Sequence, residues 1–256
     1  MSAVATFARR VRWEQKSYWR NPAAAVFTFA FPLLFLVIFT AINGNDVVSL
    51  ANGKVKFAQY YVPSIIAFGL ISACYTNLAF TICIRREGGM LKRTRGTPLH
   101  PVLYLAGIIG SVIVIAVILA ALVTALGLLL YSVTFPGRYL ALGVAIAAGA
   151  FCFSALGIAV STVVPNEDAA PAIINFVLFP LLFISGTFGR VGSHTALGKI
   201  AGVFPIRHLI ESIVNAFDPF ASGTGIIARH ILMLLLWGGV ASLVALKRFR
   251  WEPRGK

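Results

Sequence analysis

Six long and almost uninterrupted apolar runs constrain this chain more than any other feature. A helix needs about 20 apolar residues to cross a hydrocarbon layer of about 30 Å, because each residue adds about 1.5 Å. The runs are continuous and lack the polar alternation of membrane β-barrel strands. We therefore predict an all-α membrane protein with six transmembrane helices, at about residues 23–42, 59–84, 102–132, 139–164, 171–188 and 226–246.

The composition excludes most other classes of protein. Of the 256 residues, 59% are hydrophobic and 12% are charged, whereas soluble domains have about 45–50% and about 25%. A soluble globule cannot hide so much apolar surface, which excludes a cytosolic enzyme, a disordered chain and a secreted disulfide scaffold. The three cysteines all lie in apolar runs, so we interpret Cys74, Cys83 and Cys152 as small core residues and expect no metal site.

The basic residues predict how the chain is oriented in the membrane. The net charge is +14, but Lys and Arg gather beside the apolar runs, so we expect no nucleic-acid partner. They are most frequent before the first run, between the second and third runs, and after the sixth run. Because cytoplasmic segments of membrane proteins are enriched in Lys and Arg, we expect both termini in the cytoplasm. An even number of spans agrees with this orientation.

Two segments outside the apolar runs have an amphipathic pattern. We expect residues 1–22 to form a cytoplasmic helix in the headgroup layer, followed by one six-span domain over 23–256; the alternative is a solvated basic tail. Residues 206–217 predict a helix that lies at the outer interface or dips partly into the bundle, after a shorter helix near 195–203. The candidate interfacial residues of the first helix are Arg9, Arg10, Arg12, Trp13 and Lys16.

The loop after the second run has the composition of a docking segment. Gly88 and Gly89 predict the end of the preceding helix, and residues 90–95 are long enough for one or two helical turns. Met90 and Leu91 are apolar residues in a basic loop, so we expect them to be exposed and to contact a partner. A plain basic loop that only sets the orientation is the alternative.

The chain has none of the motifs that would supply energy or catalysis. The run Ser193–Ile200 lacks the first glycine and the final Ser or Thr of a phosphate-binding loop. No apolar run has an ionisable residue near its middle, which argues against an ion-coupled carrier without excluding one. We interpret the adjacent acids Glu167 and Asp168 as an N-terminal cap of the fifth span. We therefore expect no catalytic residue, and any energy must come from a partner.

Three local strings, in this order and spacing, resemble the type-2 permease subunit of ATP-binding-cassette exporters. Arg86–Pro98 resembles the first coupling loop of that family, Val164–Ala170 its second cytoplasmic loop, and Phe179–Gly186 its motif in span five. The resemblance covers essentially the whole chain. It weakens at residues 188–190 and at Pro205–His208, where the usual phenylalanine-proline and proline-leucine-threonine-tyrosine are replaced.

The resemblance implies a set of partners and contact residues. Two permease subunits, identical or paired with a sister permease, would sit on two separate ATPase subunits that bind ATP and Mg; this chain would bind no cofactor. ATP binding would move the cytoplasmic loops as levers and switch the cavity from inward to outward facing. The residues implied in ATPase coupling are Glu87, Met90, Leu91, Lys92, Arg93, Thr94, Asn166, Glu167 and Asp168.

The same resemblance implies a substrate path along spans two and five. Its aromatic residues with few amides suit an apolar or amphipathic cargo, although the amides could instead bond neighbouring helices. We expect export of a drug or lipid across a prokaryotic inner membrane; export of a lipid-linked polysaccharide, an ion-coupled carrier and an anchor without transport are the alternatives. The path residues are Ser72, Tyr75, Thr76, Asn77, Phe80, Asn175, Phe176, Phe179 and Phe183.

Overall fold

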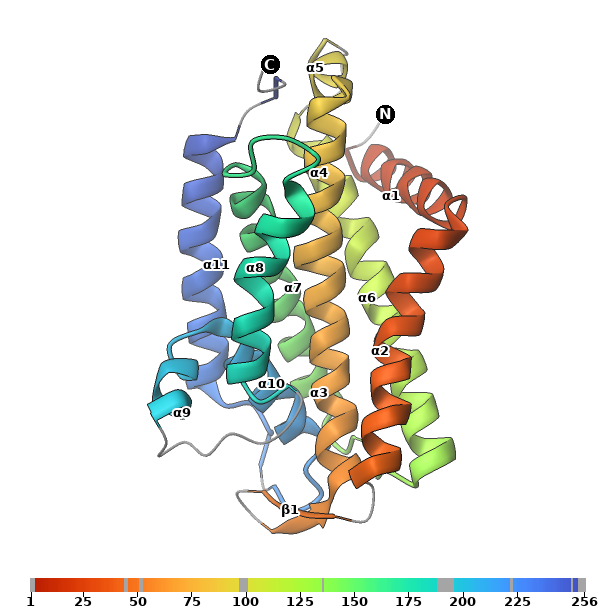
Figure 1. Cartoon of the computed structure of the whole chain (residues 1–256), viewed down its shortest axis with the longest axis vertical. Coiled ribbons are helices and arrows are strands. Elements are labelled where there is room, and N and C mark those ends of the chain that lie inside the picture. Colours follow the sequence, from red (N-terminus) through yellow and green to blue (C-terminus); the bar gives the residue numbers. More distant parts are fainter. Residues whose placement is uncertain are drawn as a thin grey trace.

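The computed structural model shows an elongated bundle of helices (Figure 1). It describes residues 3–43, 46–50, 53–96, 101–134, 136–187, 196–221, 223–249 and 251–252. The helices are α1 (Ala3–Trp19), α2 (Pro22–Asn43), α3 (Phe57–Ile71), the π-helix η1 (Ser72–Asn77), α4 (Leu78–Glu87), α5 (Met90–Arg95), α6 (Pro101–Tyr131), α7 (Tyr139–Ser161), α8 (Ala170–Ile184), α9 (Ala196–Ala201), α10 (Pro205–Phe217) and α11 (Ala228–Arg248). A two-stranded antiparallel hairpin, β1 (Val47–Ser49) and β2 (Lys54–Lys56), joins α2 to α3 and was not expected from the sequence.

Helices form at all six apolar runs, but they differ in length. Within the described residues, four helical stretches are long and apolar enough to cross a membrane: Phe57–Glu87, Val102–Tyr131, Tyr139–Ser161 and Ala228–Arg248. The apolar stretches Thr28–Asn43 and Ala170–Ile184 are shorter. The chain is therefore an all-α membrane protein.

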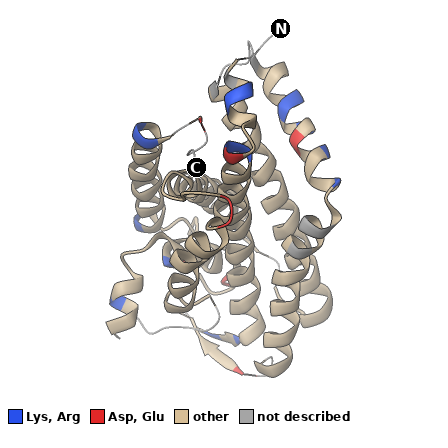
Figure 2. Cartoon of the chain, turned by 45° about the horizontal axis from the view of Figure 1, so that its top comes forward, with Lys and Arg blue, Asp and Glu red and all other residues tan. Residues whose placement is uncertain are grey.

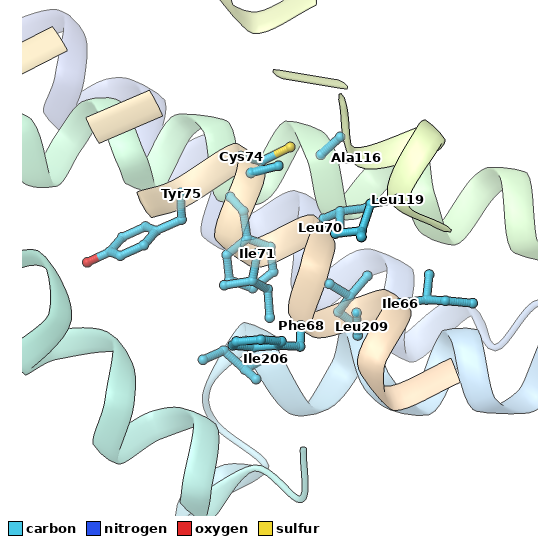
Figure 3. Packing of buried hydrophobic residues seen from close by; sticks show 14 of the residues in the cluster. Ile66, Phe68, Leu70, Ile71, Cys74, Tyr75, Ala116, Leu119, Ile206 and Leu209 are labelled. Carbon is cyan, nitrogen blue, oxygen red and sulfur yellow. The ribbon is translucent and has the colours of Figure 1, made fainter. Parts of the chain in front are cut away.

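Helix α3 lies at the centre of the bundle. All of its residues are buried, and it packs against α2, α6, α7 and α10. Figure 3 shows side chains of this core, in which Ile66, Phe68, Leu70 and Ile71 from α3 meet Leu119, Ile206 and Leu209 from α6 and α10. Close approach requires small residues here: a Cβ on Gly69 would lie 2.3 Å from Leu119 Cδ2. The cysteines Cys74, Cys83 and Cys152 are free and buried, as expected.

Helix α10 has the predicted bounds, and of the two predicted positions it takes the one inside the bundle. It packs against α3, α7 and α11, and part of its polar face is buried: His208 is 2% and Ser212 5% exposed, whereas Arg207, Glu211 and Asn215 are partly exposed. Ser212 Oγ donates to the carbonyl of His208 at 2.7 Å. The helix is thus embedded more deeply than an interfacial helix would be. Its buried polar groups keep partners inside the bundle, as buried groups away from water must.

One end of the bundle carries α1, α5 and the C-terminal end of α11, and the opposite end carries the β hairpin (Figure 1). Figure 2 shows Lys and Arg on α1, near α5 and at the end of α11. We call this the basic end. The segments that the sequence predicts to be cytoplasmic therefore meet at one end of the molecule.

Candidate functional site

A cavity of about 620 Å³ lies between α1, α2, α3, η1, α4, α6 and α8. Glu14 and Arg85 are the charged residues among the described side chains that line it. The rest of the lining is aromatic, aliphatic or neutral and polar. These other lining residues are Ser17, Tyr18, Asn21, Thr28, Phe31, Phe68, Ser72, Thr76, Asn77, Phe80, Thr81, Ile84, Ile108, Ser111, Val112, Ile115, Asn175, Leu178 and Phe179. Such a lining suits an apolar or amphipathic molecule with a few hydrogen-bonding groups.

The structure places six of the nine predicted path residues on this cavity: Ser72, Thr76, Asn77, Phe80, Asn175 and Phe179. The other three lie elsewhere. Tyr75 is buried, and its hydroxyl lies 3.4 Å from the carbonyl of Ile174, to which it donates. Phe176 and Phe183 are 80% and 65% exposed and do not line the cavity. Positions 176, 179 and 183 share one side of α8 by their i, i+3, i+7 spacing; Phe179, itself 42% exposed, reaches the cavity, whereas Phe176 and Phe183 point further outward.

The π-helix η1 supplies Ser72, Thr76 and Asn77 to the wall of the cavity. A π-helix has a wider turn than an α-helix, and such turns are frequent at functional sites. Helix α7 touches it closely at Gly157, where an added Cβ would lie 2.8 Å from the carbonyl oxygen of Tyr75 and 3.0 Å from that of Cys74. Only glycine allows α7 to approach η1 to this distance.

A buried ion pair lines the cavity at the basic end. Glu14 on α1 is 5% exposed, and its two oxygens accept bonds from Arg85 Nη1 at 2.7 Å and Nη2 at 2.6 Å. Arg10 Nη2 donates to the same carboxylate, and the Arg10 guanidinium lies 4.4 Å from the ring centre of Tyr104. Two parallel bonds between a guanidinium and a carboxylate fix orientation as well as position. The pair therefore joins α1 to α4 rigidly.

Helix α1 also packs directly on α6. Gln15 Nε2 donates to the carbonyl of Ser111 at 2.7 Å, and a Cβ on Gly107 would lie 2.2 Å from Arg10 Cγ. Of the predicted interfacial residues, Arg9, Arg12, Trp13 and Lys16 are exposed, whereas the Arg10 side chain is turned into the protein. Burial also raises the pKa of the Tyr18 hydroxyl, so this cavity-lining group stays neutral.

The predicted coupling loop forms the short helix α5. Gly89 has φ +67°, a conformation that favours glycine, and ends the preceding helix as expected. Met90 is 45% exposed, but Leu91 is fully buried, so the expectation that both would be exposed is wrong for Leu91. Leu91 lies on the side of α5 that packs on the bundle, whereas Met90 lies on its outer side. Lys92 and Arg93 are exposed, and Thr94 Oγ1 donates to the carbonyl of Met90 at 2.9 Å.

Arg86 joins the two predicted coupling segments to each other. Its side chain is 3% exposed; Nη1 donates to the carbonyl of Ser161 at 2.8 Å and Nη2 to that of Val164 at 2.7 Å. Its Nε lies 2.8 Å from Glu87 Oε1. The guanidinium thus binds the carbonyls at the C-terminal end of α7, where positive charge is favoured.

The second coupling segment is the exposed turn before α8. Asn166, Glu167 and Asp168 are all exposed. The backbone N–H of Ala169, the N-cap residue of α8, donates to Asn166 Oδ1 at 2.8 Å, and the Ala169 side chain itself forms no capping bond. The side-chain acceptor at the start of α8 is therefore the amide of Asn166, where the sequence predicts the carboxylates of Glu167 and Asp168.

Sequence reasoning did not assign Glu14, Arg85 and Arg86 to the site. One signal was available for Glu14, since an acid interrupts the apolar stripe of a basic helix. Nothing in the sequence pairs it with Arg85, 71 positions later. The described residues that could hold a metal ion, His208, Glu211 and His230, do not line the cavity.

Comparison with known families gives a match over most of the chain. The family model described as ABC-2 type transporter matches residues 7–217. A comparison with curated proteins found no match.

Proposed function

Because this chain belongs to the ABC-2 type transporter family, we propose that it exports a hydrophobic or amphipathic compound, a drug or a lipid. As a member of this family it is an integral membrane permease component without an ATPase site of its own. The cavity carries this proposal. It opens among aromatic side chains, with Asn77 and Asn175 as amide contacts and its charged pair at the basic end. An amphipathic molecule could place its polar group near that pair and its apolar part among Phe31, Phe80 and Phe179.

The family implies an ATP-binding-cassette ATPase as partner, and we propose that it docks on the basic end. Met90, Lys92 and Arg93 on α5, with Asn166, Glu167 and Asp168, offer an exposed surface of both charges and one apolar side chain. ATP and Mg would bind the ATPase. Movement of α5 would reach α7 through Arg86 and α4 directly, so the walls of the cavity would move with the partner.

We further propose six crossings, cytoplasmic termini and a prokaryotic inner membrane. The shared position of α1, α5 and the end of α11 supports an even number of crossings (Figure 1). We propose that a second permease copy, identical or a sister chain, faces α8. Phe176 and Phe183 are exposed there, and aromatic side chains on one helix face favour contact with another protein surface.

The test is co-purification followed by transport in vesicles. A tagged chain should recover an ATPase whose turnover rises in reconstituted vesicles; recovery of no ATPase would contradict the proposal. Asn77→Ala and Phe179→Ala should change the range of exported compounds because both line the cavity. Phe151→Ala on α7, an exposed phenylalanine that does not line the cavity, is the matched control for cargo range, and unchanged export by the two cavity variants would place their residues outside the path.

A further inference from the structure

Three side chains with metal-binding atoms meet where α10 and α11 begin. His208 and Glu211 lie on α10, and His230 lies in the first turn of α11. One ligand atom from each of the three lies within 4.8 Å of the other two. His208 is 2% exposed, and the side chains of His230 and Glu211 are 12% and 39% exposed. The cluster is therefore partly shielded, with Glu211 on its open side.

The hydrogen bonds of the two imidazoles indicate which nitrogens have lone pairs. His208 Nε2 lies 2.9 Å from the carbonyl oxygen of Gly202. A carbonyl only accepts, so this nitrogen carries a proton and Nδ1 of the neutral ring has a lone pair.

The second imidazole has the corresponding arrangement. His230 Nε2 lies 3.3 Å from Glu211 Oε2. A carboxylate oxygen accepts hydrogen bonds, so this nitrogen carries a proton. The Nδ1 atoms of the two rings face each other at 2.8 Å. If each outer nitrogen carries the proton of a neutral ring, two lone pairs are directed at one another. That contact is repulsive unless one ring is protonated and donates its Nδ1–H to the other, or a metal ion lies between the two nitrogens.

We propose that His208 and His230 bind a divalent transition-metal ion of the zinc class through their Nδ1 atoms, with the Glu211 carboxylate completing the site. Imidazole nitrogen suits zinc, copper and nickel. Histidines that bind metals commonly donate their other N–H to an outer acceptor such as a backbone carbonyl, as His208 does to Gly202. Tetrahedral zinc with bonds of about 2.0–2.1 Å separates two nitrogens by about 3.3 Å, so a small outward shift of the rings would admit the ion.

Neighbouring groups hold the cluster in place and show what the ion would join. Arg207 Nε lies 2.7 Å from Glu211 Oε1, and its Nη1 donates to the carbonyl of Gly198 at 2.9 Å. Trp237 Nε1 on α11 donates to the carbonyl of Val203 at 2.9 Å. A bound ion would therefore fasten α10 to α11, next to a segment from α9 that both helices already contact. The site is independent of the cargo and of the ATPase.

The test uses the full chain, purified in detergent with a tag that contains no histidine and stripped with a chelator. Zinc is then titrated, with magnesium as the control ion. Bound metal per chain and the midpoint of thermal unfolding are measured, and cobalt replaces zinc to report the ligand geometry in its visible spectrum. His230→Gln and Glu211→Gln remove ligands at the more exposed positions, and His100→Gln is a control that keeps the cluster.

We expect the original chain and His100→Gln to bind one zinc ion each and to unfold at a higher temperature with zinc, because a ligand that binds only the folded state stabilises it. His230→Gln should bind zinc at least about 10–100-fold more weakly. Elution as a single species checks that each variant is folded. If His230→Gln does not fold, Glu211→Gln provides the test. No bound zinc in the original chain, or equal affinity in a folded ligand variant, would overturn the proposal.

Discussion

The two ends of one continuous helix, α3–η1–α4, are joined to the rest of the bundle by different chemistry. At its start, Gln59 is a neutral amide: Nε2 donates to the carbonyl of Phe217 at 2.8 Å, and Oε1 accepts from the N–H of Thr134 at 2.8 Å. At its end, Arg85 forms the buried ion pair with Glu14. We call these the amide junction and the charged junction.

The amide junction anchors this helix, and the charged junction is the end at which a partner could move it. An amide bonded to backbone groups of two other segments holds α3 in one position, with no charge to separate. The charged junction joins α4 to the amphipathic helix α1 at the basic end, beside the proposed ATPase surface. Between the junctions lies η1, which forms the cavity wall. Movement imposed at the basic end would therefore displace η1 relative to the N-terminal end of α3, which the amide junction holds in place.

The largest effect is expected from Glu14→Ala. Removing one partner of a buried ion pair leaves the other charge without compensation and costs about 3–5 kcal/mol. We expect a large loss of thermal stability in detergent and loss of ATP-driven transport. The double variant Glu14→Ala, Arg85→Leu should recover much of the stability. Additive losses in this double-mutant cycle would show that the charged junction does not couple the two residues.

Gln59→Leu tests the amide junction. Unsatisfied buried backbone groups cost about 1–3 kcal/mol, so the unfolding midpoint should fall less than for Glu14→Ala. Ser64→Ala is the matched control, because Ser64 is buried in the same helix and bonds only within it, to Tyr60 at 2.9 Å. If the unfolding midpoint fell as far for Ser64→Ala as for Gln59→Leu, the bonds of Gln59 to other segments would not contribute specially to stability.

Gly157→Ala tests the contact between α7 and η1. The added Cβ meets backbone atoms of Tyr75 and Cys74, which cannot rotate away, and we expect a loss of about 1–2 kcal/mol from overpacking. Gly143→Ala on the same helix is the control, since nothing lies within 4 Å of its Cβ position. Equal thermal stability of the two variants would contradict close packing at η1.

The smallest effect on stability is expected from Glu87→Arg. Glu87 is paired with Arg86, and the change places two guanidinium groups side by side near the ends of α4 and α7. We expect normal insertion and ATP hydrolysis that no longer drives transport, measured together in vesicles. Normal export by a well-expressed Glu87→Arg chain would remove this residue from the coupling surface.

The helices could be predicted from sequence because hydropathy and helical spacing are local. The second and third runs, 59–84 and 102–132, correspond to helices at Phe57–Glu87 and Pro101–Tyr131, and the bounds of α5 and of α10 were close to those expected. The sequence left open whether α10 lies at the outer interface or dips into the bundle, since amphipathicity alone does not say whether a helix meets water, lipid or protein; the structure buries His208 and Ser212.

Prediction of the site was incomplete for a related reason. Asn77 and Phe179 reach the cavity, whereas Phe176 and Phe183 do not, because the rotation of α8 about its axis depends on tertiary packing. The burial of Leu91 has the same cause. Glu14 and Arg86 owe their positions to partners 71 and 75 residues away, and a single sequence carries no record of such pairs.

The most direct test of the central claim is transport in three kinds of vesicle, which contain the chain alone, the co-purified ATPase alone, or both together. We expect ATP-driven accumulation of an amphipathic compound only where both proteins are present. Accumulation against a gradient by the chain alone would contradict the central claim.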